Sequence, residues 1–177
     1  VRGGPSGAAL IERTDDAMLL GPDRTPHVSG GRLCLGIVNS VRWRRSHDPI
    51  EELQSYADVV RNVSRAGWLE STDDLLRESE DHPRKARSTL SRVADLREAL
   101  FRLFSDVAAG DPPRSTDLEC LNVHLVESLA QLEIQPGAHG EFHAQWSNDT
   151  DLDVLVWQIA ASAGALLTSD DVRKLKQ

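Results

Sequence analysis

The sequence predicts a mainly α fold, with about five to six helices and one small β-hairpin. In residues 84–109 and again in residues 152–166, apolar side chains recur at the three- and four-residue spacing of an amphipathic helix. Residues 132–147 instead alternate apolar and polar side chains around a turn rich in proline and glycine, which is typical of a hairpin. Because an isolated hairpin is only marginally stable, we expect it to pack on the helices.

The length of 177 residues suits one domain with its own core. Residues 1–28 are rich in Gly, Pro and Asp and are expected to form a flexible N-terminal arm, so that residues 29–177 form the helical domain. Two cysteines provide no disulfide framework, and no apolar run approaches the roughly 20 residues of a membrane span. We therefore expect a cytoplasmic protein without a membrane partner.

The first ordered segment is predicted at residues 33–41, where nearly continuous apolar residues allow either a buried strand or a short buried helix. The next helix is predicted to begin at Asp48-Pro49-Ile50-Glu51, which combines a cap, a first-turn proline and a carboxylate that reaches back. Gly67 is expected to end it. Its inward face is expected to contain Leu53, Tyr56, Ala57, Val60 and Ser64.

A short helix is predicted at about 72–80, with Ser71 as its cap. The longest helix is predicted to begin after Pro83 and to end before Gly110. Its wide apolar stripe consists of Leu90, Val93, Leu96, Leu100, Phe101, Phe104 and Val107.

Thr116-Asp117-Leu118-Glu119 forms a second capping box and predicts another helix. One side of that helix is expected to consist of Leu118, Leu121, Leu125, Leu129 and Leu132. After the hairpin, residues 148–151 are expected to cap a strong final helix. Residues 168–171 then start a short basic helix that contains Arg173, Lys174 and Lys176.

Charge is distributed unevenly along this acidic chain, whose formal net charge is −8. No acidic residue lies between Asp23 and Asp48, where the sequence contains five arginines: Arg24, Arg32, Arg42, Arg44 and Arg45. Such an island argues against nucleic-acid binding over the whole surface, but it suits an anion, a phosphate or an acidic partner at one place. The alternative is that these arginines pair with acids from elsewhere in the fold.

Four segments together resemble the ABATE domain of bacterial CGNR zinc-finger proteins, over residues 29–177. They are GGRLCLGIVNS at 30–40, EELQSYADVVRNVSRAGWL at 51–69, LREALFRLFSDVAAGDPP at 96–113 and LDVLVWQIAASAGALLTSDDVRKLKQ at 152–177. The resemblance favours a helix for residues 33–41. It also implies a stress-responsive transcription regulator. One departure is Gly36, where the family usually has an acidic residue.

Family members normally continue into a zinc finger with four cysteines. This chain has only Cys34 and Cys120, and it stops at Gln177, where that finger would begin. The resemblance therefore implies that zinc and most of the DNA contact belong to a finger that is absent here. No cofactor is expected in this chain itself.

Asn39, Arg42 and Trp43 are predicted to meet Trp157 from the final helix in a ligand pocket. An arginine there would hold an anionic group while an indole covers an apolar ring. Core packing is the alternative for Trp157. For the chain end, Arg173, Lys174 and Lys176 are predicted to contact the DNA backbone, and a solvated helix end is the alternative.

Other candidate sites are less favoured. His139, Glu141 and His143 would share one face of a hairpin, but incidental surface histidines are favoured over a metal site. Apolar neighbours argue that Cys34 is buried rather than reactive. No catalytic residues are assigned, because the spacing reveals no Ser–His–Asp set and no glycine-rich phosphate loop.

The sequence thus predicts a regulatory, ligand-sensing domain of a transcription regulator and not an enzyme. Its expected partners are DNA through the full-length protein, a small-molecule ligand and a second copy in a homodimer. The alternatives are an oligomerisation scaffold that pairs DNA-binding fingers and, less favoured, a small-molecule-binding enzyme.

Overall fold

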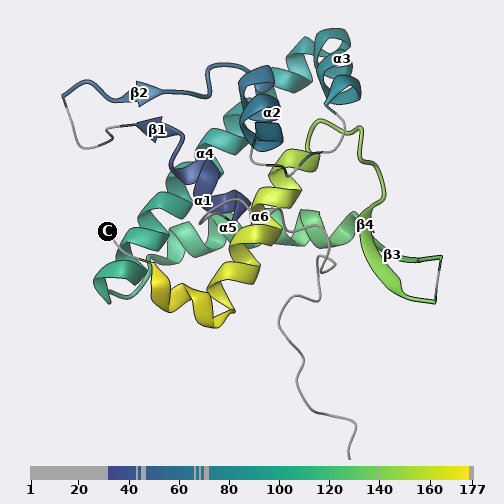
Figure 1. Cartoon of the computed structure of the whole chain (residues 1–177). Coiled ribbons are helices and arrows are strands. Elements are labelled where there is room, and N and C mark those ends of the chain that lie inside the picture. Colours follow the sequence, from purple (N-terminus) through teal and green to yellow (C-terminus); the bar gives the residue numbers. More distant parts are fainter. Residues whose placement is uncertain are drawn as a thin grey trace, which may run out of the picture.

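The computed structural model confirms a mainly α protein with a small hairpin (Figure 1). It describes residues 32–42, 44, 47–65, 67, 69, 72–138 and 140–175. Several predicted features lie outside these residues, namely the arm at 1–28, Trp43, Ser71, His139 and Lys176.

The helices are α1 (Leu33–Val38), α2 (Tyr56–Arg65), α3 (Asp73–Asp81), α4 (Pro83–Ala109), α5 (Ser115–Ala130), α6 (Val154–Leu167) and the 3-10 helix η1 (Asp170–Lys174). Two antiparallel pairs of strands accompany them. The first pairs β1 (Val41–Arg42) with β2 (Ile50–Glu51), and the second pairs β3 (Leu132–Pro136) with β4 (Phe142–Trp146). In Figure 1 the β1–β2 ribbon and the β3–β4 hairpin project from opposite sides of the helices.

The core of the molecule surrounds α6, which packs against α1, α4, α5 and η1. Most residues of α6 are buried, as its nearly continuous apolar sequence predicts. Gly164 lets α5 approach closely, since a Cβ atom there would lie 3.1 Å from Cδ2 of Leu125. Among the described residues, no helix has both the length and the apolar character that a membrane crossing requires.

Local signals predicted several elements correctly. Residues 33–38 form a helix, as the resemblance favours. The longest helix begins at Pro83 and ends at Gly110, whose φ of 79° is the left-handed conformation that glycine adopts readily. The hairpin at 132–146 and the short helices after residues 72 and 169 are also present.

The predicted start of the second helix is wrong. Ile50 and Glu51 form strand β2, and α2 begins only at Tyr56. The actual cap is Ser55, whose hydroxyl accepts a hydrogen bond from Asp58 N–H at 3.2 Å and donates one to the Asp58 carboxylate at 2.8 Å. The Glu51 carboxylate instead binds a distant arginine, which a local capping pattern does not reveal.

The predicted inward face of α5 is only partly correct. Leu121 is buried and Leu125 packs against the core, but Leu118 and Leu129 are exposed. The predicted capping box is also wrong, because the helix begins at Ser115 and its N-cap is Arg114. The Asp117 carboxylate of the predicted box instead binds Arg102 of α4 at 2.6 Å. The positions of α4 and α6 therefore decide which side of α5 faces inward.

Candidate functional site

Arg97 of α4 fixes the β1–β2 ribbon to the helical core. Its side chain is only 5% exposed and donates two hydrogen bonds to the Glu51 carboxylate, at 2.7 and 2.6 Å. It also donates to Glu98 at 3.1 Å and to the Ser40 hydroxyl at 3.2 Å. This guanidinium therefore binds protein groups from three segments and serves as a structural tie.

The electrostatics of this pair keep both partners charged. Burial alone would raise the pKa of Glu51, but hydrogen bonds from Arg97 and from Leu53 N–H outweigh it and lower that pKa. Burial would likewise lower the pKa of Arg97, but the carboxylates of Glu51 and Glu98 raise it. The tie therefore persists at neutral pH.

The described arginines of the basic island also pair with acids, as the alternative interpretation predicts. Arg32 binds Asp171 at 2.9 Å, and Arg42 lies 3.5 Å from Glu52. Arg44 pairs with Glu98, and its guanidinium lies 4.2 Å from the centre of the Phe101 ring. Arg24 and Arg45 of the island lie outside the described residues.

An open polar groove of about 310 Å³ lies beside this ribbon, along the outer face of α2. It is lined by Glu52, Asp58, Arg61, Asn62 and Arg65. This volume is at the lower end of the range for small-molecule sites, and arginine and amide groups are suitable donors for carboxylate or phosphate oxygens. The groove is thus a candidate site for a small, anionic ligand.

Two of the charged side chains that line the groove already bind each other. Arg61 donates to Asp58 at 2.8 Å, one turn earlier on α2. The hydrogen bond with the Ser55 hydroxyl, followed by the charge of Arg61, lowers the pKa of Asp58. Asp58 is therefore a stable anion that competes with an incoming ligand for Arg61, which leaves Asn62 and Arg65 as the more available donors.

Only part of the predicted ligand pocket lies near this groove. Asn39 is exposed at the end of α1, and Arg42 contacts the groove residue Glu52. Trp157 instead is buried against Trp146 of the hairpin, with ring centres 6.4 Å apart. The β1–β2 ribbon, which contains Arg42, and the β3–β4 hairpin, against which Trp157 packs, lie on opposite sides of the helices in Figure 1, so the structure does not bring Trp157 and Arg42 together.

The sequence interpretation missed the groove residues on α2. Asp58, Arg61, Asn62 and Arg65 lie three or four residues apart, so they share the face of α2 opposite its buried Tyr56, Val59, Val60 and Val63. A polar stripe of this kind is common on solvent-facing helices. Only its position beside the ribbon, which is a tertiary feature, distinguishes it.

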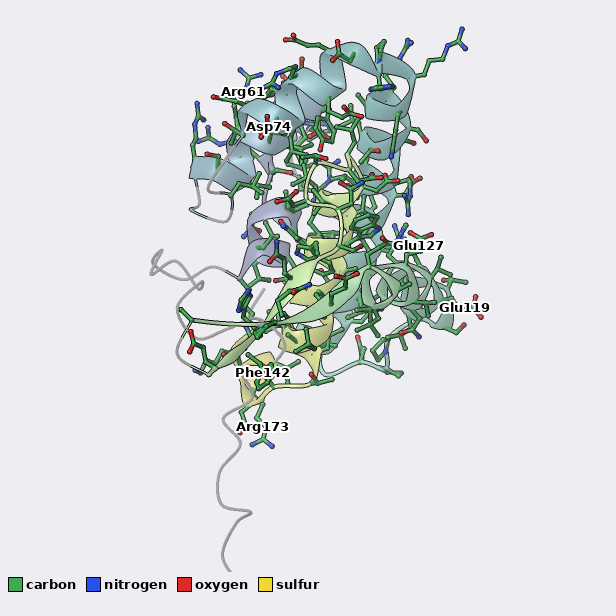
Figure 2. All side chains as sticks on the ribbon, turned by 90° about the vertical axis from the view of Figure 1, so that its right-hand side faces the viewer. Arg61, Asp74, Glu119, Glu127, Phe142 and Arg173 are labelled. Atoms are coloured by element: carbon green, nitrogen blue, oxygen red, sulfur yellow. The ribbon has the colours of Figure 1, made fainter. Side chains whose placement is uncertain are left out.

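Two of the three cations predicted to contact DNA at the chain end pair with neighbouring acids in the structure. Lys174 binds Asp171 at 2.6 Å, and Arg173 lies 3.9 Å from Asp170. Hydrogen bonds from Lys174 and Arg32 lower the pKa of Asp171 to about 2. Figure 2 shows Arg173 at the edge of the molecule, and its side chain is 83% exposed, so it is accessible to a partner.

Cys34 is fully buried in α1, and its backbone N–H donates to the Ser162 hydroxyl of α6 at 3.2 Å. Burial raises the pKa of its thiol to about 11, which disfavours the reactive thiolate at neutral pH. Within the described residues, no group of three or more His, Cys, Asp or Glu side chains gathers to hold a metal ion.

The fold and the site define a helical module with a polar surface groove, in which the first helix, α1, packs on α6. A family model named ABATE, with the description "Putative stress-induced transcription regulator", matches residues 31–170. The match covers most of the chain, which therefore belongs to the ABATE family. Searches of curated proteins and of solved structures found no significant match.

Proposed function

We propose that this chain is the regulatory domain of a transcription regulator and has no catalytic activity of its own. In this proposal a small anionic molecule binds beside the ribbon and changes the packing of α6. That change alters the position of a DNA-binding segment that follows η1. The family description supports the regulatory role, and the arrangement of α1 supports the coupling.

The observation that carries the proposal is that α1 packs on α6 while Arg32, the residue before α1, contacts the start of η1. Cys34 N–H at the start of α1 donates to Ser162 of α6, and Arg32 just before it donates to Ser169 and Asp171 at 3.1 and 2.9 Å. The end of α1 leads within three residues into strand β1. Movement of the ribbon is therefore connected, through one short helix, to the segment that follows α6.

In the same proposal, DNA is contacted mainly by a following segment with four cysteines that binds zinc. Arg173, Lys174 and Lys176 lead toward that segment. Three cations alone give only weak binding that falls steeply with salt, so the present chain is expected to bind DNA poorly.

The test compares DNA binding by this chain with that by a version extended through the expected four-cysteine segment, each with and without zinc. Fluorescence anisotropy on labelled duplex DNA is a suitable measurement. Only the extended, zinc-loaded form is expected to bind at physiological salt. Equal binding by the present chain would contradict the proposed division of roles.

The ligand step is tested by thermal shift with a panel of small carboxylates and phosphates, followed by DNA binding of the extended form with each hit. Arg65→Gln is expected to abolish the shift. Arg77→Gln is a matched control, because Arg77 pairs with Asp74 on the neighbouring α3 and does not line the groove. Figure 2 labels Asp74 on α3 and Arg61 on α2. Hits that leave DNA affinity unchanged would contradict regulation by this groove.

A further inference from the structure

The charged side chains that line the groove beside the ribbon are arranged by sign along α2. In Figure 1 the chain leaves β2 and turns into α2. The two acids of the lining, Glu52 and Asp58, lie just before this helix and in its first turn, whereas Arg65 is its last residue. With a rise of about 1.5 Å per residue, roughly 10 Å separates Asp58 from Arg65 along the helix axis. The groove therefore has an acidic end and a basic end.

The charges of this lining balance each other. Glu52 and Asp58 carry the negative charges, Arg61 and Arg65 carry an equal positive charge, and Asn62 is neutral. A purely anionic ligand is attracted by the arginines but repelled by the acids at the other end of the groove. A ligand that carries an ammonium group as well as a carboxylate group meets an opposite charge at both ends, which favours it over ligands of a single sign.

The basic end contains a donor that the protein itself does not use. Arg61 is occupied, because its guanidinium donates to Asp58 at 2.8 Å and to the Ala57 carbonyl at 3.0 Å. Arg65, by contrast, is exposed and forms no ion pair with any other described residue. The Asn62 amide lies three residues earlier on the same face of α2. Together, Arg65 and Asn62 are suitable donors for a carboxylate.

The acidic end contains one carboxylate that an incoming cation can reach. Asp58 is already bound by Arg61, whereas the contact of Glu52 with Arg42 is loose, at 3.5 Å. The side chains of Glu52 and Arg42 are 37% and 61% exposed, and exposed pairs of this kind contribute little to stability, so an ammonium group can replace Arg42. The backbone of Glu52 is fixed, since its N–H donates to the carbonyl of the buried Ser40 at 3.1 Å.

We propose that the ligand of this groove is a small amino carboxylate whose ammonium group binds Glu52 and whose carboxylate group binds Asn62 and Arg65. This inference rests on the proposed function and narrows it, because the anionic group becomes one end of a molecule whose other end is cationic. The separation of the two ends of the groove requires a chain of several bonds between the charged groups. An ω-amino acid meets this requirement, whereas an α-amino acid, with its charges adjacent, does not.

The test uses 6-aminohexanoate, hexanoate and glycine as probes. Each is titrated into the isotope-labelled chain, and binding is followed by NMR through the backbone amide shifts of α2 and Glu52. We expect 6-aminohexanoate to bind about three- to fivefold more tightly than hexanoate, which is the gain that one exposed ion pair provides. Glycine cannot reach both ends of the groove and should bind more weakly than 6-aminohexanoate.

Two variants test the two ends of the groove separately. Glu52→Gln is expected to abolish the preference for 6-aminohexanoate over hexanoate, and Arg65→Gln is expected to weaken the binding of both probes. Glu80→Gln is the matched control for Glu52→Gln, because Glu80 is exposed on α3 and does not line the groove. This control should leave the preference unchanged. Circular dichroism establishes that all three variants fold, which their positions at the surface favour.

The outcomes separate this inference from the proposed function. Equal binding of hexanoate and 6-aminohexanoate, or a preference that survives Glu52→Gln, would overturn the amino carboxylate and leave an anionic ligand of the groove in place. Absence of amide shifts with 6-aminohexanoate would also overturn the inference alone, provided that a member of the carboxylate and phosphate panel binds the groove. Absence of binding by the probes and by the whole panel would overturn both proposals.

Discussion

Residues 32–114 and residues 115–172 differ in the number of basic residues that they contain. The first region contains thirteen arginines, whereas the second contains no arginine or lysine at all. Apolar residues differ in the opposite direction, because among the described residues the large exposed ones belong to the second region, apart from Ile50. The comparison indicates that ion pairs hold the first region together, whereas the second region leaves apolar side chains exposed.

The two regions meet along α4, whose cations neutralise acids of the second region. Arg92 pairs with Glu127 and with Asp153, and Arg102 pairs with Asp117. The outer half of the hairpin has apolar Ile134 and Phe142 on one face and polar Gln135 and His143 on the other.

The strongest test of the first region is Arg97→Met. This change retains an apolar stem but removes the partner of Glu51, and it should lower the free energy of unfolding by about 2–4 kcal/mol, less than for a fully enclosed pair because Glu51 is partly exposed. The matched control, Arg61→Met, removes an exposed pair one turn apart and should cost less than about 0.5 kcal/mol. Urea denaturation measures both losses of stability. Equal losses would contradict the role of Arg97 as a structural tie and the small contribution of the exposed Arg61 pair.

The second region is tested by comparing the base and the tip of its hairpin. Trp146→Ala removes the contact with Trp157 and should cost about 2–3 kcal/mol, less than a fully buried tryptophan. Phe142→Ala should cost less than about 0.5 kcal/mol at concentrations where the chain is monomeric, because its ring contacts mainly solvent. A large loss at Phe142 under those conditions would mean that the tip is covered within one chain.

Two glycine substitutions, one in each region, test how closely the helices pack. Gly36→Ala should stabilise the protein by about 0.5–1 kcal/mol, because alanine favours the helix and no atom lies within 4 Å of the new Cβ. Gly164→Ala should gain less, since its Cβ would press on Leu125 at 3.1 Å, where α5 and α6 meet. Thermal melting of both variants is the measurement, and a larger gain at Gly164 would contradict the close approach.

Local sequence signals predicted those elements whose stabilising contacts are near in sequence. The start of α4 at Pro83 and its end at Gly110 are examples, as is the hairpin with its proline- and glycine-rich turn. The prediction failed where a residue that is distant in the sequence determines the local structure. Glu51 was predicted to reach back to a helix cap at Asp48, yet its carboxylate binds Arg97, which lies 46 residues away.

The candidate site was predicted less well for the same reason. Arg42 and Asn39 were identified from the basic island, but the groove on α2 arises only when the ribbon folds beside that helix. Trp157 was placed in the ligand pocket because its packing against Trp146 has no local signal. Binding by these residues stays a prediction that the ligand screen addresses.

The smallest expected effect concerns Asp171, which Arg32 connects to the start of α1. Its pKa lies near 2 because Lys174, and then Arg32, hydrogen-bond to the carboxylate. A lowered pKa means that these contacts stabilise the fold fully above pH 4 and are lost as the pH falls through about 2. Arg32→Gln should raise the pKa of Asp171 toward its ordinary value, and Lys174→Gln should raise it further, as its hydrogen bond is the larger cause.

Carboxyl carbon chemical shifts followed by NMR between pH 5 and pH 1.5 give this pKa directly. Asp170, one residue earlier, is the internal control, because its contact with Arg173 is loose, at 3.9 Å. An unchanged pKa of Asp171 in Arg32→Gln would mean that Arg32 does not hold η1 in solution. The proposed coupling between α1 and the end of the chain would then lose its main contact, although the packing of Cys34 against Ser162 would remain.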